Sequence, residues 1–310
     1  QMMLQFDKRA QGYDSEKAKL KFAMAMKAWE QKASEQRAAG KKVARKPRLQ
    51  ANPMKNQNRP SNLFNGMINP LVPFGIRGVI WYQGERNAKT IEAGELYAEQ
   101  LKLMITDWRN RWGASDLPFI TVQLPNFHKA TDAVLQNTGW VMVRESQWKS
   151  LELKNTGIAV TTDVGMANDI HPKNKQVVGQ RLALWALGTT YKKDIVYSGP
   201  LFKGIQFDGS KSEGNRRCVL SMGHGGDGLK ASDGSTDIKG FVIAGKDRVF
   251  YSAKAAYDAQ SGKIIVSSDN VLDPIAVRYN WSDNPSGNLV NSADLPAAPF
   301  RTDTWKIKAD

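Results

Sequence analysis

Short apolar runs alternate with longer amphipathic segments between residues 78 and 188, and this alternation constrains the fold most. The runs at 78–82, 118–124 and 157–162 have the length of buried strands. Apolar residues recur at helical spacing from Tyr97 to Trp112, at 139–150, and from Lys175 to Gly188. Strands and helices that alternate in this way pair in parallel through right-handed crossovers. The sequence therefore predicts part of an α/β layer, with the run at 78–82 buried on both faces.

Beyond Gly199 the helical period disappears. Short β-prone runs occur at 218–222, 240–244, 249–253, 263–267 and 276–281, separated by Gly, Asp, Asn and Ser. This pattern predicts an antiparallel β module over residues 200–310, behind an α/β domain over residues 61–199.

The first 60 residues differ in composition from the rest. They hold 15 Lys or Arg and 5 Asp or Glu, so most of the net charge of +14 lies in this segment. Strong helix formers fill residues 14–45, and a basic connector with Pro and Asn follows. We interpret residues 1–60 as a basic helical insertion and linker with a solvated charged face, and not as a nucleic-acid-binding arm.

Several classes of protein have no support in the sequence. No apolar run is long enough to span a bilayer, and Cys218 is the single cysteine. The three histidines lie far apart, and neither a His-Glu-x-x-His motif nor a nucleotide-binding glycine fingerprint occurs. We therefore expect no metal and no organic cofactor.

Polar loops that directly follow predicted strands are the candidate sites, because ligands of open α/β sheets bind outside the carboxyl ends of the strands. The first loop holds Gln83, Gly84, Glu85 and Asn87. Gly84 permits close backbone approach, and the flanking amides and side chains could donate hydrogen bonds to a developing oxyanion. The residues alone favour a tight turn in which Asn87 caps the next helix.

The second loop, after the run at 157–162, leads to Asp169 and His171. A carboxylate beside a histidine can fix its tautomer and stabilise the imidazolium, as a general base for a hydroxyl nucleophile requires. A structural histidine and a turn aspartate would produce the same pattern, and the residues alone leave both interpretations open.

A nucleophile is missing from the motifs. No Gly-x-Ser-x-Gly elbow occurs, and none of the serines follows a predicted parallel strand in a glycine context.

The blocks at 61–71 and 76–85, the Asp-Trp-Arg at 107–109 and the Asp-Ile-His-Pro at 169–172 resemble the sialate O-acetylesterase family of the SGNH-hydrolase superfamily. Similar blocks continue to residue 303, among them Gly-Asn-Leu at 287–289 and Pro-Phe-Arg-Thr-Asp at 299–303. The resemblance implies a partial SGNH-hydrolase-like parallel sheet with flanking helices, followed by the antiparallel β module.

The resemblance also implies a serine esterase that removes acetyl groups from sugars. His171 would be the base, Asp169 its orienting acid, and the loop from Gln83 to Glu85, with Asn87, part of the oxyanion and substrate site. Many relatives place the acid three residues before the histidine, where this chain has Asn168, so Asp163 or Glu85 remains an alternative.

The family's nucleophile lies in a Gly-Gln-Ser-Asn segment that this sequence does not contain. We therefore expect a missing N-terminal segment to carry the serine, and the chain alone to be inactive. The expected partner is an acetylated carbohydrate, in the periplasm or secreted from a bacterium. A non-catalytic carbohydrate-binding protein is the alternative, and the sequence does not choose among acetylated sugars.

Overall fold

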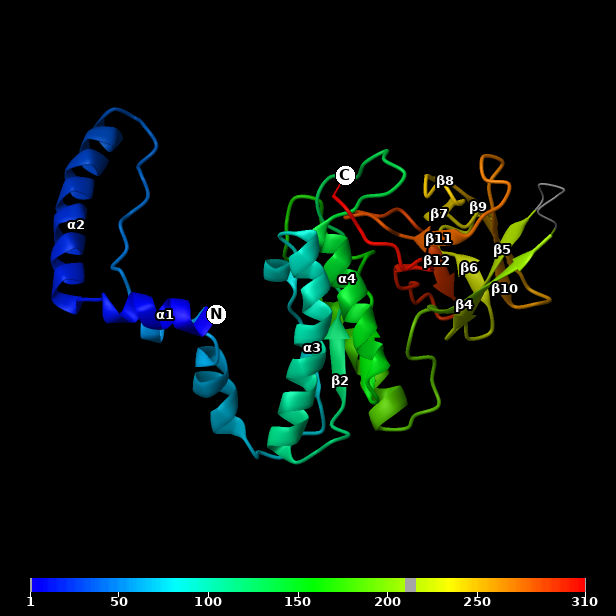
Figure 1. Ribbon diagram of the computed structural model, residues 1–310, viewed down its shortest axis with the longest axis horizontal. Coiled ribbons are helices and arrows are strands. Elements are labelled where there is room, and N and C mark those ends of the chain that lie inside the picture. Colours follow the sequence, from blue (N-terminus) through cyan, green and yellow to red (C-terminus); the bar gives the residue numbers. More distant parts are fainter. Residues whose placement is uncertain (1, 210–215, 310) are drawn as a thin grey trace. The chain divides into compact units, whose positions relative to one another are not determined.

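The chain divides into two compact units, Gln1–Phe74 and Gly75–Asp310, and each is described by itself (Figure 1). The computed structural model describes residues 2–209 and 216–309. The domain boundaries at residues 60 and 199 stay predictions.

The first unit is helical. It contains α1 (Met2–Gln11), α2 (Ser15–Ala38), a 3₁₀ turn at Pro53–Lys55, a π turn at Phe64–Ile68 and a 3₁₀ turn at Asn69–Leu71. Asp14 caps α2, because its carboxylate accepts the amide hydrogens of Glu16 and Lys17 at 2.9 and 3.0 Å. The predicted helix at 14–45 is confirmed, although it ends at Ala38 and an extended connector follows.

The second unit begins with a parallel sheet in the order β1-β2-β3, formed by Val79–Trp81, Phe119–Val122 and Thr156–Ala159. Its helices are α3 (Ile91–Trp112), α4 (Gly139–Lys149) and α5 (Lys175–Trp185), with a 3₁₀ turn at Glu85–Asn87, another at Ser150–Glu152, and a π turn at Ala186–Thr190. The alternation of strands and helices predicted from the sequence is confirmed.

The sheet lies between two helical layers. Phe119 of β2 packs with apolar residues of α3 and α4, whereas its neighbour Ile120 packs with α5. Successive side chains of a strand point to opposite faces, so β2 contributes to both cores. Helices α3 and α4 run side by side (Figure 1), and Gly94 allows their close approach, since a Cβ there would lie 2.6 Å from Cβ of Met142.

The prediction that the 78–82 run is buried on both faces is wrong. Ile80 is 66% exposed, and Val79 and Trp81 are only partly buried. Ile80 pairs with Ile120 and therefore shares the face that α5 covers over β2 and β3. Within the described residues β1 is an edge strand, so the apolar run lacks the neighbours that would bury it.

The remaining strands form the antiparallel module that the sequence predicts. One sheet has the order β4-β5-β10-β9 (Leu201–Asp208, Arg217–Gly223, Lys263–Ser267, Lys254–Asp258), and a second has the order β13-β11-β7-β8 (Phe300–Arg301, Ala276–Tyr279, Phe241–Ala244, Phe250–Ser252). A two-stranded pair joins β12 (Leu289–Asn291) to β6 (Leu229–Ala231). The two larger sheets share one apolar core, which makes the module a β-sandwich.

Helix α4 joins the α/β layer to this module. Its residues from Gly139 to Gln147 are all buried, although the helix is not uniformly apolar. Glu145 accepts a bidentate pair from Arg301 of the module at 2.6 and 3.1 Å. Arg301 and Arg278 also bond Asp303, so buried charges on both sides of the junction are paired.

Candidate active site

The first predicted loop and the histidine loop line one open cavity of about 620 Å³ at the carboxyl end of β1. Its described lining includes Gln83 and Glu85 from the first loop and His171 from the second. The carboxyl end of a strand is where an open α/β sheet is expected to place its site. The two candidate loops named from the sequence thus border the same cavity.

Gln83 is held in place by a chain of hydrogen bonds beneath the cavity. Trp81 Nε1 donates to the Tyr97 hydroxyl at 3.0 Å, and that hydroxyl lies 2.9 Å from the Gln83 carbonyl oxygen and 3.0 Å from its Oε1. Burial raises the pKa of Tyr97 to about 12, so the phenol remains a donor at neutral pH. Gln83 Nε2 donates to Asn87 Oδ1 at 3.1 Å, and Asn87 in turn donates to Gln100.

The close approach that Gly84 permits is to helix α4. A Cβ at this position would lie 2.8 Å from Val143 Cγ1 and 3.1 Å from Gln147 Nε2, both on α4. Its amide hydrogen is donated to Glu85 Oε2 at 3.0 Å. Neither Gly84 nor Asn87 belongs to the described cavity lining. An oxyanion role for the Gly84 amide would require Glu85 to release it.

Asn87 does not cap the following helix. It ends the 3₁₀ turn at Glu85–Asn87, and Thr90 caps α3 by accepting the Ala93 amide hydrogen at 3.1 Å. Asn87 instead fixes the side-chain amide of Gln83, which lies at the cavity.

His171 and Asp169 lie close together but do not form a direct side-chain hydrogen bond. His171 Nδ1 is 3.8 Å from Asp169 Oδ1, and the same oxygen accepts the His171 backbone amide hydrogen at 2.9 Å. The His171 side chain is 81% exposed. A side-chain rotation that shortens the separation to ~3 Å would give the hydrogen bond that a base and its orienting acid share.

Asp163 is engaged elsewhere. Its two carboxylate oxygens accept from Arg181 at 2.6 Å each, in a bidentate pair. Arg181 also donates to the Val160 carbonyl oxygen at 2.7 Å, which ties this pair to the end of β3. Both oxygens of Asp163 are therefore occupied, which disfavours it as the acid that orients His171. Glu85, in contrast, lines the same cavity as His171.

The loop between β3 and α5 is anchored on both sides of the histidine. Asn126 Oδ1 accepts the Gly165 amide hydrogen at 2.6 Å, and Asn126 Nδ2 donates to Asn284 Oδ1 at 3.0 Å. Asn174 then caps α5 by accepting the Val177 amide hydrogen at 3.2 Å. The histidine loop thus connects to both the α/β layer and the β-sandwich.

Three cationic residues that were not site candidates also line the cavity, namely Arg86, Lys89 and Lys175. Lys175 Nζ lies 4.5 Å from the centre of the Tyr82 ring and donates to its hydroxyl at 3.2 Å. The position of Lys175 at the start of the helix after the His171 loop was the available signal. These cations favour an electron-rich group in the cavity.

Within residues 2–209 and 216–309, no cluster of three His, Cys, Asp or Glu side chains could hold a metal ion. Over the same residues, no helix combines the length and the apolar character that a bilayer span requires.

Residues 51–187 match the sequence model of a family described as carbohydrate esterase, sialic acid-specific acetylesterase. The mouse sialate O-acetylesterase is 33% identical over 271 residues, which cover 78% of this chain and 47% of the mouse protein. The rat sialate O-acetylesterase is 32% identical over 167 residues, covering 47% of this chain and 29% of the rat protein.

A crystal structure of a carbohydrate acetylesterase from Xanthomonas citri is 45% identical, with a TM-score of 0.72. The match covers 81% of this chain and 56% of that chain. The chain thus spans about half the length of the mouse and Xanthomonas relatives, and less of the rat protein. The resemblance found from the sequence blocks is confirmed, and the chain belongs to the sialate O-acetylesterase family of carbohydrate esterases.

Proposed function

We propose that this chain forms the histidine-bearing part of a serine carbohydrate O-acetylesterase, which releases acetate from acetylated sugars. The observation that carries the proposal is the common cavity of His171, Gln83 and Glu85 at the carboxyl end of β1. Membership of a carbohydrate esterase family supports the reaction class.

The nucleophile comes from outside the described cavity lining. No serine, threonine or cysteine is among the described residues that line it. We propose that an N-terminal segment, not contained in this sequence, supplies the serine beside His171. The exposed Ile80 and the edge position of β1 are compatible with further polypeptide packing at this side of the sheet.

The reaction then proceeds as a two-step acyl transfer. The serine oxygen bonds to the acetyl carbon while His171 takes its proton, and donors from the 83–87 loop stabilise the oxyanion. His171 returns the proton to the sugar oxygen as the ester bond breaks, which leaves an acetyl-serine. Water, deprotonated by His171, attacks this ester and releases acetate and the serine hydroxyl.

The test extends this 310-residue chain upstream in its own reading frame and compares the longer chain with the original. Acetate release from acetylated xylose and from acetylated sialic acid is measured for both. We expect activity in the longer chain alone, and a roughly 10²- to 10⁴-fold loss of kcat on His171→Ala.

His128→Ala is the matched control, because His128 does not line the described cavity. Full activity in the His171→Ala variant of the longer chain would refute the proposed base. Acetate release by the 310-residue chain, abolished by His171→Ala, would refute the need for an external serine. We also propose export to the periplasm or beyond, which cell fractionation tests directly.

A further inference from the structure

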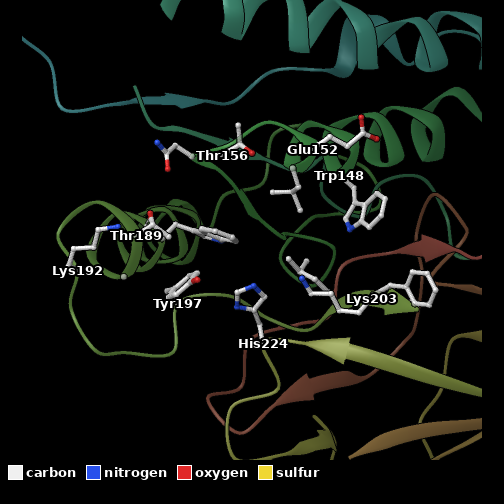
Figure 2. Close-up of a pocket in the computed structure, with 14 residues that line it drawn as sticks. Trp148, Glu152, Thr156, Thr189, Lys192, Tyr197, Lys203 and His224 are labelled. Carbon is white, nitrogen blue, oxygen red and sulfur yellow. Dashed lines mark hydrogen bonds between the residues drawn. The ribbon is translucent and has the colours of Figure 1, made fainter. Parts of the chain in front are cut away.

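A second cleft, of about 570 Å³, lies at the other end of the parallel sheet (Figure 2). Thr156 in its lining is the first residue of β3, whereas the candidate active site follows the last residue of β1. Since these strands are parallel, the two cavities lie at opposite ends of the sheet. The second cleft is bounded by α4, the end of α5 and the first strand of the β-sandwich. Its volume is within the ~300–1,000 Å³ range of small-ligand sites.

Aromatic rings form one side of this cleft. Trp185 and Tyr197 meet edge to face with centroids 5.0 Å apart, and His224 lies 5.2 Å from Tyr197. Trp185 is held against β3, since its Nε1 donates to the Ile158 carbonyl oxygen at 2.7 Å. Tyr197 remains partly exposed, so its ring can contact the apolar C–H face of a sugar ring.

Polar and cationic groups surround these rings. In the view of Figure 2, Lys192 and Lys203 lie on opposite sides of Tyr197 and His224. Both lysines are exposed, and within the described residues neither forms an ion pair. The acid in the lining, Glu152, is paired with Lys102 at 3.3 Å. The cleft therefore carries unneutralised positive charge.

Trp148 adds an unused donor. Its Nε1 is buried and has no hydrogen-bond partner in the described part of the chain. Figure 2 shows this nitrogen on the side of the ring nearer to Lys203. Indole N–H groups that are buried normally find an acceptor, and an oxygen of a ligand in this cleft would provide one. Burial, with the charge of Lys203, also lowers the pKa of His224, so a neutral imidazole can both donate and accept.

We propose that this cleft, defined by Trp148, Lys192, Tyr197, Lys203 and His224, is a second saccharide-binding site for a sugar that bears a carboxylate. The aromatic rings contact the sugar ring, the indole and imidazole bond its hydroxyls, and the positive charge of the two lysines, one on either side, attracts the carboxylate. The choice of a saccharide rests on the proposed function, whereas the choice of an anion rests on the two lysines. The site would hold an acidic glycan on the protein while another part of it reaches the active site.

The test uses D-glucuronic acid as probe and D-glucose as its uncharged counterpart, with the 310-residue chain. Binding is followed by saturation-transfer NMR and by titration of tryptophan fluorescence. We expect glucuronic acid to bind more tightly than glucose. Lys203→Gln and Lys192→Gln should each weaken it about three- to tenfold, the range expected for a partly exposed charge contact.

Lys193→Gln is the matched control, because this neighbouring lysine does not line the cleft. It should leave affinity unchanged, as should His171→Ala. Absence of binding, equal weakening by Lys193→Gln, or loss of binding in His171→Ala would each overturn the proposal. Retained binding together with no esterase activity in the longer chain would reject the proposed function and leave this site standing.

Discussion

Replacing Arg144 by methionine tests how the β-sandwich is fixed to the α/β layer. Arg144 lies on α4, is 1% exposed, and donates to backbone carbonyl oxygens only. Its Nε bonds Leu124 at 2.9 Å, and its Nη atoms bond Pro125, Ser282 at 2.6 Å and Asp283 at 2.7 Å. Two of these acceptors lie in the segment that follows β2, and two lie in the segment of the sandwich that follows β11. One side chain thus joins both parts.

The cost of Arg144→Met follows from the acceptors that it leaves. The Pro125 carbonyl keeps the Trp140 indole donor at 2.8 Å, and the Asp283 carbonyl keeps the Phe127 amide at 3.1 Å. The carbonyls of Leu124 and Ser282 lose their described donor, at about 1–3 kcal/mol each.

Relief of the buried charge offsets part of this loss, since burial lowers the pKa of Arg144 to about 9. We therefore expect a net loss of about 2–4 kcal/mol in the free energy of unfolding, measured by urea denaturation with tryptophan fluorescence. The control is Arg217→Met, which breaks an exposed pair with Asp208 and should cost no more than ~1 kcal/mol. If Arg144→Met changes stability by less than the control does, the junction does not depend on these hydrogen bonds.

Three smaller predictions concern the site and the core. Gly84→Ala should destabilise the protein by about 1–3 kcal/mol in thermal unfolding, because the new Cβ would meet Val143 at 2.8 Å; an unchanged melting temperature would show that α4 yields freely. Asn174→Ala should cost ~1 kcal/mol in urea unfolding by removing the cap on the Val177 amide, whereas Asn174→Asp should retain most of it. Burial raises the pKa of Cys218 to about 12, so the unfolded chain ionises this thiol first; disulfide-reagent labelling at pH 8 should occur only on unfolding, and rapid labelling of the folded chain would contradict this.

The alternation of periods in the sequence was sufficient to predict the three parallel strands and the helices between them. Helix α3 shows why, since Tyr97, Leu101 and Ile105 recur at helical spacing and all three are buried. Strand β4 shows the limit of this prediction, because it is not among the β-prone runs recognised in the sequence. Of its residues Leu201–Asp208, Leu201 alone is buried, so the strand has no strong apolar pattern, and backbone pairing with β5 holds it.

The error at 78–82 has a related cause. An apolar run indicates that a strand can be buried, but burial requires neighbours on both sides and on both faces. Val79 and Trp81 face the side of α3 and α4, where they are only partly buried. Ile80 faces the side of α5, but α5 packs over β2 and β3 and leaves Ile80 exposed. The composition of the strand contains no information about where its covering helix ends.

The site was predictable in position and less so in its internal bonding. Loops after parallel strands lie at the same edge of a sheet, and this rule made the loops of Gln83, Glu85 and His171 the candidate sites. All three residues line one cavity. The rule could not show that Glu85 accepts the Gly84 amide, or that Asp163 is held by Arg181. Such pairings depend on side-chain geometry that spacing along the chain does not determine.

These bonds narrow the choice of acid for His171. Asp163 would have to give up two hydrogen bonds of 2.6 Å to Arg181, whereas Asp169 needs to move by ~1 Å relative to the imidazole. Glu85 accepts the Gly84 amide hydrogen through Oε2, and its Oε1 has no described partner; release of that amide would free a donor for the oxyanion. In the longer chain, Asp169→Asn should therefore lower kcat by roughly 10²-fold or more and Asp163→Asn only slightly. A larger loss for Glu85→Gln than for Asp169→Asn would assign the orienting role to the first loop instead.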